Sequence, residues 1–171
     1  PIPALVLVAC ATRPASVPSD DWVVAVKSVR LPQRDWIPWF TRFAEHTWVE
    51  VATPRGCERV EWTKGATGIV HSEIGRDGLR EDVRWEQPVA VHAVWRGDRA
   101  RSLGERILAV ADEWPEARNY RAWPGSNSNT YLAWLAREAG FGVELPPNAV
   151  GRDYAPWLAV GASTTGLGLR L

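Results

Sequence analysis

The chain is poor in the residues that build metal sites and disulfide frameworks. Its 171 residues include two cysteines, Cys10 and Cys57, and three histidines, His46, His71 and His92. Two cysteines form neither a disulfide framework nor a cysteine-rich zinc site, and the histidines lack the H-x-x-x-H spacing of zinc ligands on one helix. We therefore predict a hydrophobic core without a metal or a cofactor, which a chain of this length can build.

An excess of charge of one sign is also absent. Twenty Lys and Arg balance twenty Asp and Glu, and the basic residues are scattered along the chain. A nucleic-acid-binding surface needs clustered positive charge, so we exclude DNA and RNA as partners. The sequence contains no internal repeat, heptad pattern or low-complexity tract. A chain of this length most simply forms one domain.

The apolar run at residues 1–10 is too short to span a membrane. Its ending, Leu-Val-Ala-Cys, resembles a bacterial lipobox, in which the thiol of Cys10 takes a lipid and the Pro- and Ser-containing residues up to 20 form a tether. A buried first strand is the alternative. The lipobox interpretation predicts a cell-envelope protein, membrane-anchored or periplasmic, with a single folded domain over residues 21–171.

Tryptophan is the abundant aromatic residue, with 11 Trp against three Phe and three Tyr. Such rings build a core, line a groove for carbohydrate or lipid, or lie at a membrane interface. Composition alone does not choose among these. If the rings line a ligand groove, some of Trp36, Trp39, Trp48 and Trp123 should be partly exposed beside the segment 127–130. If all four are buried, the tryptophans only build the core.

Alternating and β-branched runs predict four main strands and one weaker strand. The main strands are expected at 22–29, 46–51, 58–62 and 88–95, and the weaker one at 68–71. Residues 46–51 and 58–62 should form a hairpin across the turn Pro54-Arg55-Gly56. In the second strand, His46, Trp48 and Glu50 share one face, because side chains alternate along a strand.

Other segments of the chain give weaker signals. Ser102-Leu103-Gly104-Glu105 has the pattern of a capping box and predicts a helix over 102–114, which Pro115 ends. The Pro-rich residues 143–154 are expected to lie extended over the surface. The alternating leucines of 167–171 suit a final edge strand.

The stretch 121–135 carries the most specific local pattern. Pro124-Gly125 breaks regular structure, and the segment 127–130, Asn-Ser-Asn-Thr, supplies side chains that cap a helix expected over 129–139. A side chain at such a start lies near unpaired N–H groups and the positive end of the helix dipole. An enzyme can place a nucleophile there beside oxyanion donors. A well-capped helix without catalytic function is the alternative.

Three segments together resemble a bacterial family catalogued as domain of unknown function 3750. They are Trp123–Thr130, His46-Thr47-Trp48 and Leu145–Tyr154, and the resemblance covers roughly residues 22–154. The family's usual form reads P-G-P-N-S-N-T and G-K-D-Y, from which Ser126 and Arg152 depart mildly. Because the family has no established activity, the resemblance implies a fold rather than a function.

The order of these residues is also similar to that of permuted papain-like peptidases and acyltransferases, of the NlpC type and the lecithin:retinol acyltransferase type. In those proteins the helix begins Asn-Cys, where this chain has Asn127-Ser128. The resemblance implies an α+β fold with a mostly antiparallel sheet packed against helices, Ser128 as nucleophile and His46 as general base. A hydroxyl needs a base in contact and a third group to orient that base. Glu61 is our candidate for this group.

Two residues compete with Glu61, namely Glu50 on the strand face of His46, and His71. Two functions also follow from the pattern. The first is a hydrolase or acyltransferase that cleaves an amide or ester bond, with Asn127 and Asn129 near the oxyanion and Trp48 and Trp123 near the substrate. The second is a non-catalytic envelope module that binds a lipid, glycan or peptide in a Trp-lined groove.

Overall fold

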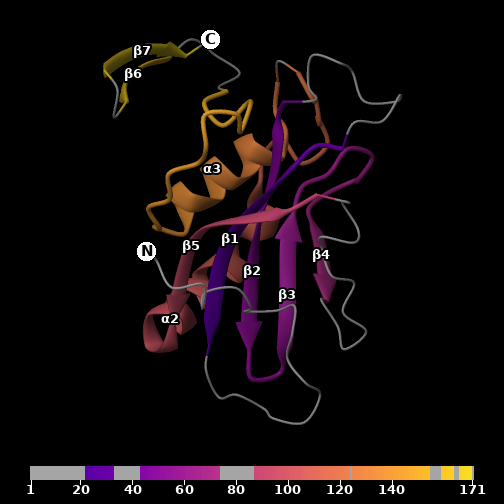
Figure 1. Cartoon of the computed structure of the whole chain (residues 1–171), viewed down its shortest axis with the longest axis vertical. Coiled ribbons are helices and arrows are strands. Elements are labelled where there is room, and N and C mark those ends of the chain that lie inside the picture. Colours follow the sequence, from indigo (N-terminus) through magenta and orange to yellow (C-terminus); the bar gives the residue numbers. More distant parts are fainter. Residues whose placement is uncertain are drawn as a thin grey trace.

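The computed structural model describes residues 22–32, 43–73, 87–123 and 125–154, and the backbone of 159–163 and 166–170. The expected strands form a five-stranded antiparallel sheet with the order β4-β3-β2-β1-β5 (Figure 1). The strands are β1 (Val23–Arg30), β2 (Glu45–Thr53), β3 (Gly56–Glu61), β4 (Val70–Glu73) and β5 (Val89–Arg96). The predicted hairpin is confirmed as β2 and β3, with Val49 opposite Val60 and Thr53 opposite Gly56.

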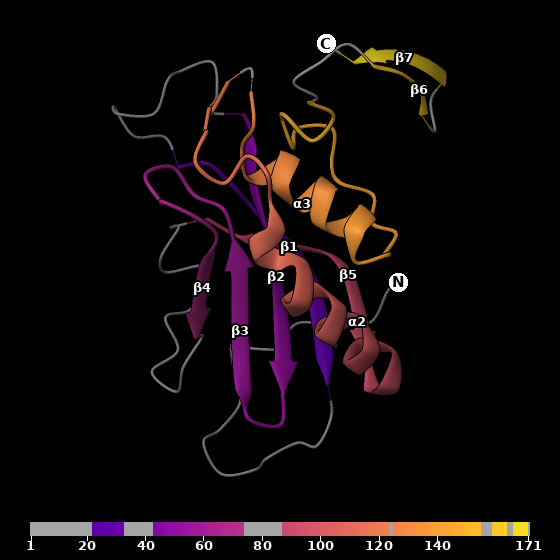
Figure 2. The same cartoon turned by 180° about the vertical axis from the view of Figure 1, so that it is seen from behind.

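The helices α2 (Gly97–Val110) and α3 (Ser128–Glu138) cover one face of this sheet (Figure 2). Valines from β1, β2 and β3 pack there against apolar residues from both helices. This core includes Val24, Val26, Val49, Val51, Val60, Leu103, Ile107, Leu132 and Leu135, all at most 2% exposed. The alternation of each strand thus supplies one apolar face, and the expected α+β fold is confirmed.

The predicted start of α2 at the Ser102 capping box is wrong. The helix begins at Gly97, directly after β5, where a φ of +60° turns the chain sharply. Ser102 lies inside the helix and accepts a hydrogen bond from Arg106 Nη1 at 2.8 Å. The α-helix ends at Val110 and continues as the 3₁₀ helix η2 (Ala111–Glu113). A Ser-x-x-Glu pattern fits any helical turn, so it does not fix where a helix starts.

The segment 143–154 was expected on the surface, but part of it is buried. Leu145 and Ala149 join the core at 5% and 1% exposure. The carbonyl of Asn148 accepts a hydrogen bond from the N–H of Glu45 at 3.0 Å. Prolines favour an extended backbone without determining whether that backbone is exposed. This segment therefore anchors the beginning of β2.

The final strand exists, but it does not lie at the edge of the main sheet. β7 (Gly166–Arg170) pairs with β6 (Ala159–Ser163) in a separate two-stranded sheet. Cys10, Trp36, Trp39 and the segment 1–20 lie outside the described residues. Within the described part of the chain, no helix has the length and apolar character needed to cross a membrane.

Candidate functional site

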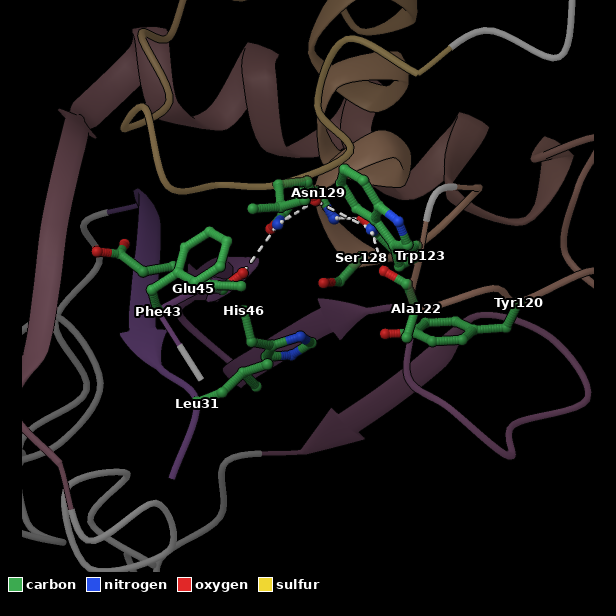
Figure 3. A pocket seen from close by; sticks show the side chains of 12 residues that line it. Leu31, Phe43, Glu45, His46, Tyr120, Ala122, Trp123, Ser128 and Asn129 are labelled. Carbon is green, nitrogen blue, oxygen red and sulfur yellow. Dashed lines mark hydrogen bonds between the residues drawn. The ribbon is translucent and has the colours of Figure 1, made fainter. Parts of the chain in front are cut away.

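The beginnings of β2 and α3 meet at a cavity of about 480 Å³. Ser128, from the first turn of α3, and His46, from β2, both line this cavity together with Tyr120. Figure 3 shows these side chains around the same space. The other lining residues are Leu31, Phe43, Ala44, Glu45, Ala122, Trp123, Asn127, Asn129 and Val150. The fold therefore brings together the predicted nucleophile and the predicted base, which come from distant parts of the sequence.

Asn127 fixes the beginning of α3. Its Oδ1 accepts hydrogen bonds from the backbone N–H groups of Asn129 at 2.9 Å and Thr130 at 3.3 Å. Thr130 Oγ1 in turn accepts from the N–H of Asn127 at 3.2 Å, which completes a capping box. Asn127 Nδ2 donates to the carbonyls of Ala122 at 3.2 Å and Val150 at 2.9 Å. The side-chain amide of Asn127 is thus engaged in shaping the loop.

Asn129 ties α3 to β2 and to the segment 143–154. Its Nδ2 donates to the carbonyls of Glu45 at 2.8 Å and Val150 at 2.9 Å. Its Oδ1 accepts from Thr47 Oγ1 at 2.9 Å. Because Thr47 and Glu45 flank His46 in the chain, these bonds hold Ser128 and His46 at a fixed separation. Asn127 and Asn129 therefore act on the site by positioning it.

His46 is held by the expected orienting residue. His46 Nε2 lies 2.5 Å from Glu61 Oε2, and Arg59 Nη2 lies 2.7 Å from the same oxygen. Burial acts to raise the pKa of Glu61, but hydrogen bonds and charge from His46 and Arg59 outweigh it and lower the pKa from 4.5 to about 2. Glu61 is thus ionised at neutral pH and accepts the Nε2 proton of His46. A general base at this position would use the other ring nitrogen, Nδ1.

The two competing residues have other partners. Glu50 binds Lys27 Nζ at 2.6 Å and accepts from Trp48 Nε1 at 3.0 Å. His71 lies at the exposed edge of the sheet, where it contacts Glu58 and Asp112. Of the three candidates, Glu61 is the one that contacts His46. No group of three His, Cys, Asp or Glu in the described ranges is placed to hold a metal ion.

The two predicted tryptophans have different surroundings. Trp48 is 1% exposed and stacks on His46, with ring centroids 5.9 Å apart. The guanidinium of Arg59 lies 4.2 Å from the centroid of the Trp48 ring, so Trp48 supports the His46–Glu61 pair from within the protein. Trp123, in contrast, lines the cavity beside the segment 127–130 and is 59% exposed. Of these two tryptophans, Trp123 is the one placed to contact a ligand.

Tyr120 is a site residue that the sequence did not indicate. It lines the cavity, and its ring is held edge-on against Trp62 at 5.0 Å. Burial raises the pKa of the Tyr120 hydroxyl, hydrogen bonds with the side chain and backbone of Ser128 lower it, and the net direction is upward. The phenol therefore stays neutral and can donate a hydrogen bond beside Ser128. It lies in a turn-rich stretch without periodicity, so its closeness to the 121–135 stretch was the sole available signal.

Glu45 brings a carboxylate to the opposite side of the cavity. Its Oε2 accepts from Ser28 Oγ, and its Oε1 accepts from Asn148 Nδ2 at 2.9 Å. Ser28 Oγ also lies 2.7 Å from Nε2 of His92, which comes from β5. Burial lowers the pKa of His92, while the charge of Glu45 acts to raise it. Both oxygens of Glu45 thus have protein partners.

Residues 26–154 match the family described as "Protein of unknown function (DUF3750)". The chain belongs to this family. The match confirms the first resemblance and includes His46, Glu61, Tyr120 and Ser128. No curated protein and no solved structure matches the chain. The family is thus established, and a function has to be argued from the site itself.

Proposed function

We propose that this member of the DUF3750 family is a serine-dependent hydrolase or acyltransferase that cleaves an amide or ester bond. The observation that carries the proposal is that Ser128 and His46 line one cavity while Glu61 contacts Nε2 of the His46 ring. A nucleophile, a base and an orienting carboxylate are the three parts that an activated hydroxyl requires. Their order on β2, β3 and the start of α3 supports the permuted papain-like arrangement.

In this mechanism, Ser128 Oγ attacks the carbonyl carbon of the substrate and transfers its proton to His46. The ionised Glu61 stabilises the imidazolium that forms. Collapse of the tetrahedral intermediate breaks the C–N or C–O bond, and the leaving group takes the proton from His46. Water in hydrolysis, or an acceptor amine or hydroxyl in transfer, then attacks the acyl-Ser128 ester, and its proton passes to His46 and on to Ser128 Oγ.

The negative charge of the intermediate needs donors close to Ser128. The side-chain N–H groups of Asn127 and Asn129 and the backbone N–H of Asn129 already have protein partners. We assign this role to the backbone N–H of Ser128, at the positive end of α3, and to the phenol of Tyr120. These two groups hydrogen-bond to each other in the structure, so the oxyanion would replace that bond. Loss of one such donor typically costs about 10²–10³-fold in kcat.

A fluorophosphonate probe tests the proposal, because it reacts with activated serines. Wild-type protein should label, and Ser128→Ala should abolish labelling with little change in the thermal unfolding temperature. His46→Gln should also abolish it, since glutamine keeps a donor for Glu61 but is not a base. Ser126→Ala, a buried serine of the same loop, is the matched control and should label normally. Absence of labelling in the wild type, or its loss in Ser126→Ala alone, contradicts the assignment.

The rival is a non-catalytic envelope module that binds a lipid, glycan or peptide. The exposed rings of Trp123 and Phe43 beside the cavity favour ligand binding as such, with or without catalysis. Under this hypothesis the probe labels nothing, while a ligand still binds. The envelope location stays a prediction, because Cys10 lies outside the described residues, and detergent phase partition of the native precursor and its Cys10→Ala variant can test it.

A further inference from the structure

The cavity beside Ser128 has an apolar wall. Six of its lining residues are Leu31, Phe43, Ala44, Ala122, Trp123 and Val150, and the lining contains no Lys or Arg. An anionic group that entered this space would lose its water without gaining a Lys or Arg counter-ion. The wall therefore selects against phosphate and carboxylate groups away from Ser128.

The polar atoms of the wall are already hydrogen-bonded to the protein. Glu45 accepts from Ser28 and Asn148, and the amides of Asn127 and Asn129 bind backbone carbonyls and helix N–H groups. A glycan needs polar partners for its hydroxyl groups, and a peptide needs them for its backbone. The remaining polar side chains of the lining are those of Ser128, His46 and Tyr120. A ligand that fits has one polar, reactive end and an apolar remainder.

The apolar surface continues from the cavity to the outside. Phe43 and Trp123 are the two exposed large hydrophobic residues of the described chain, at 51% and 59% exposure, and both line the cavity. Figure 3 shows the two rings near the Ser128 and His46 side chains. Exposed rings grouped in this way are typical of a binding site, because scattered surface residues do not gather around one opening.

We propose that this cavity binds the apolar acyl chain of the substrate, with the acyl carbonyl at Ser128. The reaction part of this inference rests on the proposed function, while the binding part does not. Ser128 Oγ would form the new bond to the acyl carbon, and the ester or amide bond of the donor would break. The chain could come from a soluble acyl ester or from a bilayer lipid, which share this chemistry.

The first arm of the test measures turnover of 4-nitrophenyl esters from acetate to decanoate. The ratio kcat/KM should rise roughly fourfold for each added CH₂ group until the cavity is full. Ala122→Trp, which narrows the cavity, should remove this gain. Ala109→Trp, which alters another exposed alanine, on α2 and outside the lining, is the matched control and should keep it. Equal turnover of all esters by the wild type would overturn the inference.

The second arm measures binding without reaction. 1-Decanol should raise the unfolding temperature of wild-type, Ser128→Ala and Ala109→Trp proteins, but not of Ala122→Trp, and N-acetylglucosamine should raise none of them. If decanol behaves in this way while no ester is cleaved, the proposed function fails and the acyl-chain site stands. If esters are cleaved but decanol has no effect, the acyl-chain site fails alone. Cleavage of phosphatidylcholine vesicles, compared with monomeric esters, distinguishes a bilayer from a soluble source.

Discussion

Gly151 lies directly against the residue that caps α3. It has a φ of +93°, and a Cβ added there would lie 2.4 Å from Asn127 Nδ2. Its carbonyl also accepts a hydrogen bond from Thr130 Oγ1 at 2.6 Å. The absence of a side chain at Gly151 therefore allows the loop to close over the helix start that carries Ser128.

We predict that Gly151→Ala lowers the free energy of unfolding by about 2–3 kcal/mol, from backbone strain and a disturbed cap. Gly65 is a suitable control, because its φ is +88° and nothing lies within 4 Å of an added Cβ. Gly65→Ala should cost about 1 kcal/mol, the strain alone. Urea unfolding of both variants measures the difference. Equal losses would show that the contact with Asn127 contributes nothing.

At the residue scale, the sequence predicted the elements that carry His46 and Ser128, but not the neighbours of these residues. Strand alternation placed His46 on a defined face, and the capping pattern placed Ser128 at a helix start. Residue type does not specify partners, however. It could not show that the amides of Asn127 and Asn129 are used for positioning, or that the hydroxyl of Tyr120 lies beside Ser128.

At the scale of elements, α2 packs unusually close to the sheet. An added Cβ on Gly104, inside this helix, would lie 2.8 Å from Val51 Cγ1 and 3.1 Å from the Trp22 ring. Val51 is a buried β-branched residue of β2, so it has little freedom to move. Gly104 therefore sets the distance between α2 and the sheet.

We predict that Gly104→Ala destabilises the protein by about 1–3 kcal/mol through overpacking, although alanine is the better helix former. Ala109→Gly, at an exposed position of the same helix, should cost about 1 kcal/mol through propensity alone. Thermal unfolding of the two variants measures whether each substitution lowers the stability of the protein. A gain in stability from Gly104→Ala would mean that α2 moves away from Val51 without loss.

The strands were predicted well because alternation and β-branching are local signals. The start of α2 and the burial of 143–154 depend on contacts with distant residues, such as the bond between the N–H of Glu45 and the carbonyl of Asn148. Local patterns contain no information on such contacts. The DUF3750 resemblance added the order of the segments, but not the bonds between them.

At the scale of the whole molecule, the cavity is assembled from four separated parts of the chain. Its walls come from Leu31, from residues 43–46, from residues 120, 122–123 and 127–129, and from Val150. The sequence could place Ser128 and His46 on their elements. The apolar wall of the cavity, however, forms only when the elements pack together. Two titrating groups near this cavity, His92 and Glu61, couple its packing to pH.

Stability should fall in two steps as the pH is lowered. The pKa of folded His92 lies below 6.5, so the unfolded state binds more protons just below pH 6.5 and gains stability there. Folded Glu61 has a pKa of about 2 against 4.5, so its stabilisation is complete above pH 4.5 and is lost as the pH falls towards 2. This second loss is on the order of 3 kcal/mol.

Urea unfolding between pH 7 and pH 2.5 measures both steps. His92→Gln should flatten the decline just below pH 6.5 and leave the one below pH 4.5. Glu61→Gln should flatten the decline below pH 4.5 and leave the one just below pH 6.5, because it removes the carboxylate that Arg59 and His46 stabilise. The readout is the slope against pH, so a uniform loss of stability in either variant does not obscure it. Curves that stay parallel to the wild type below pH 4.5 in Glu61→Gln would mean that Glu61 does not hold the buried charge on which the orientation of His46 depends.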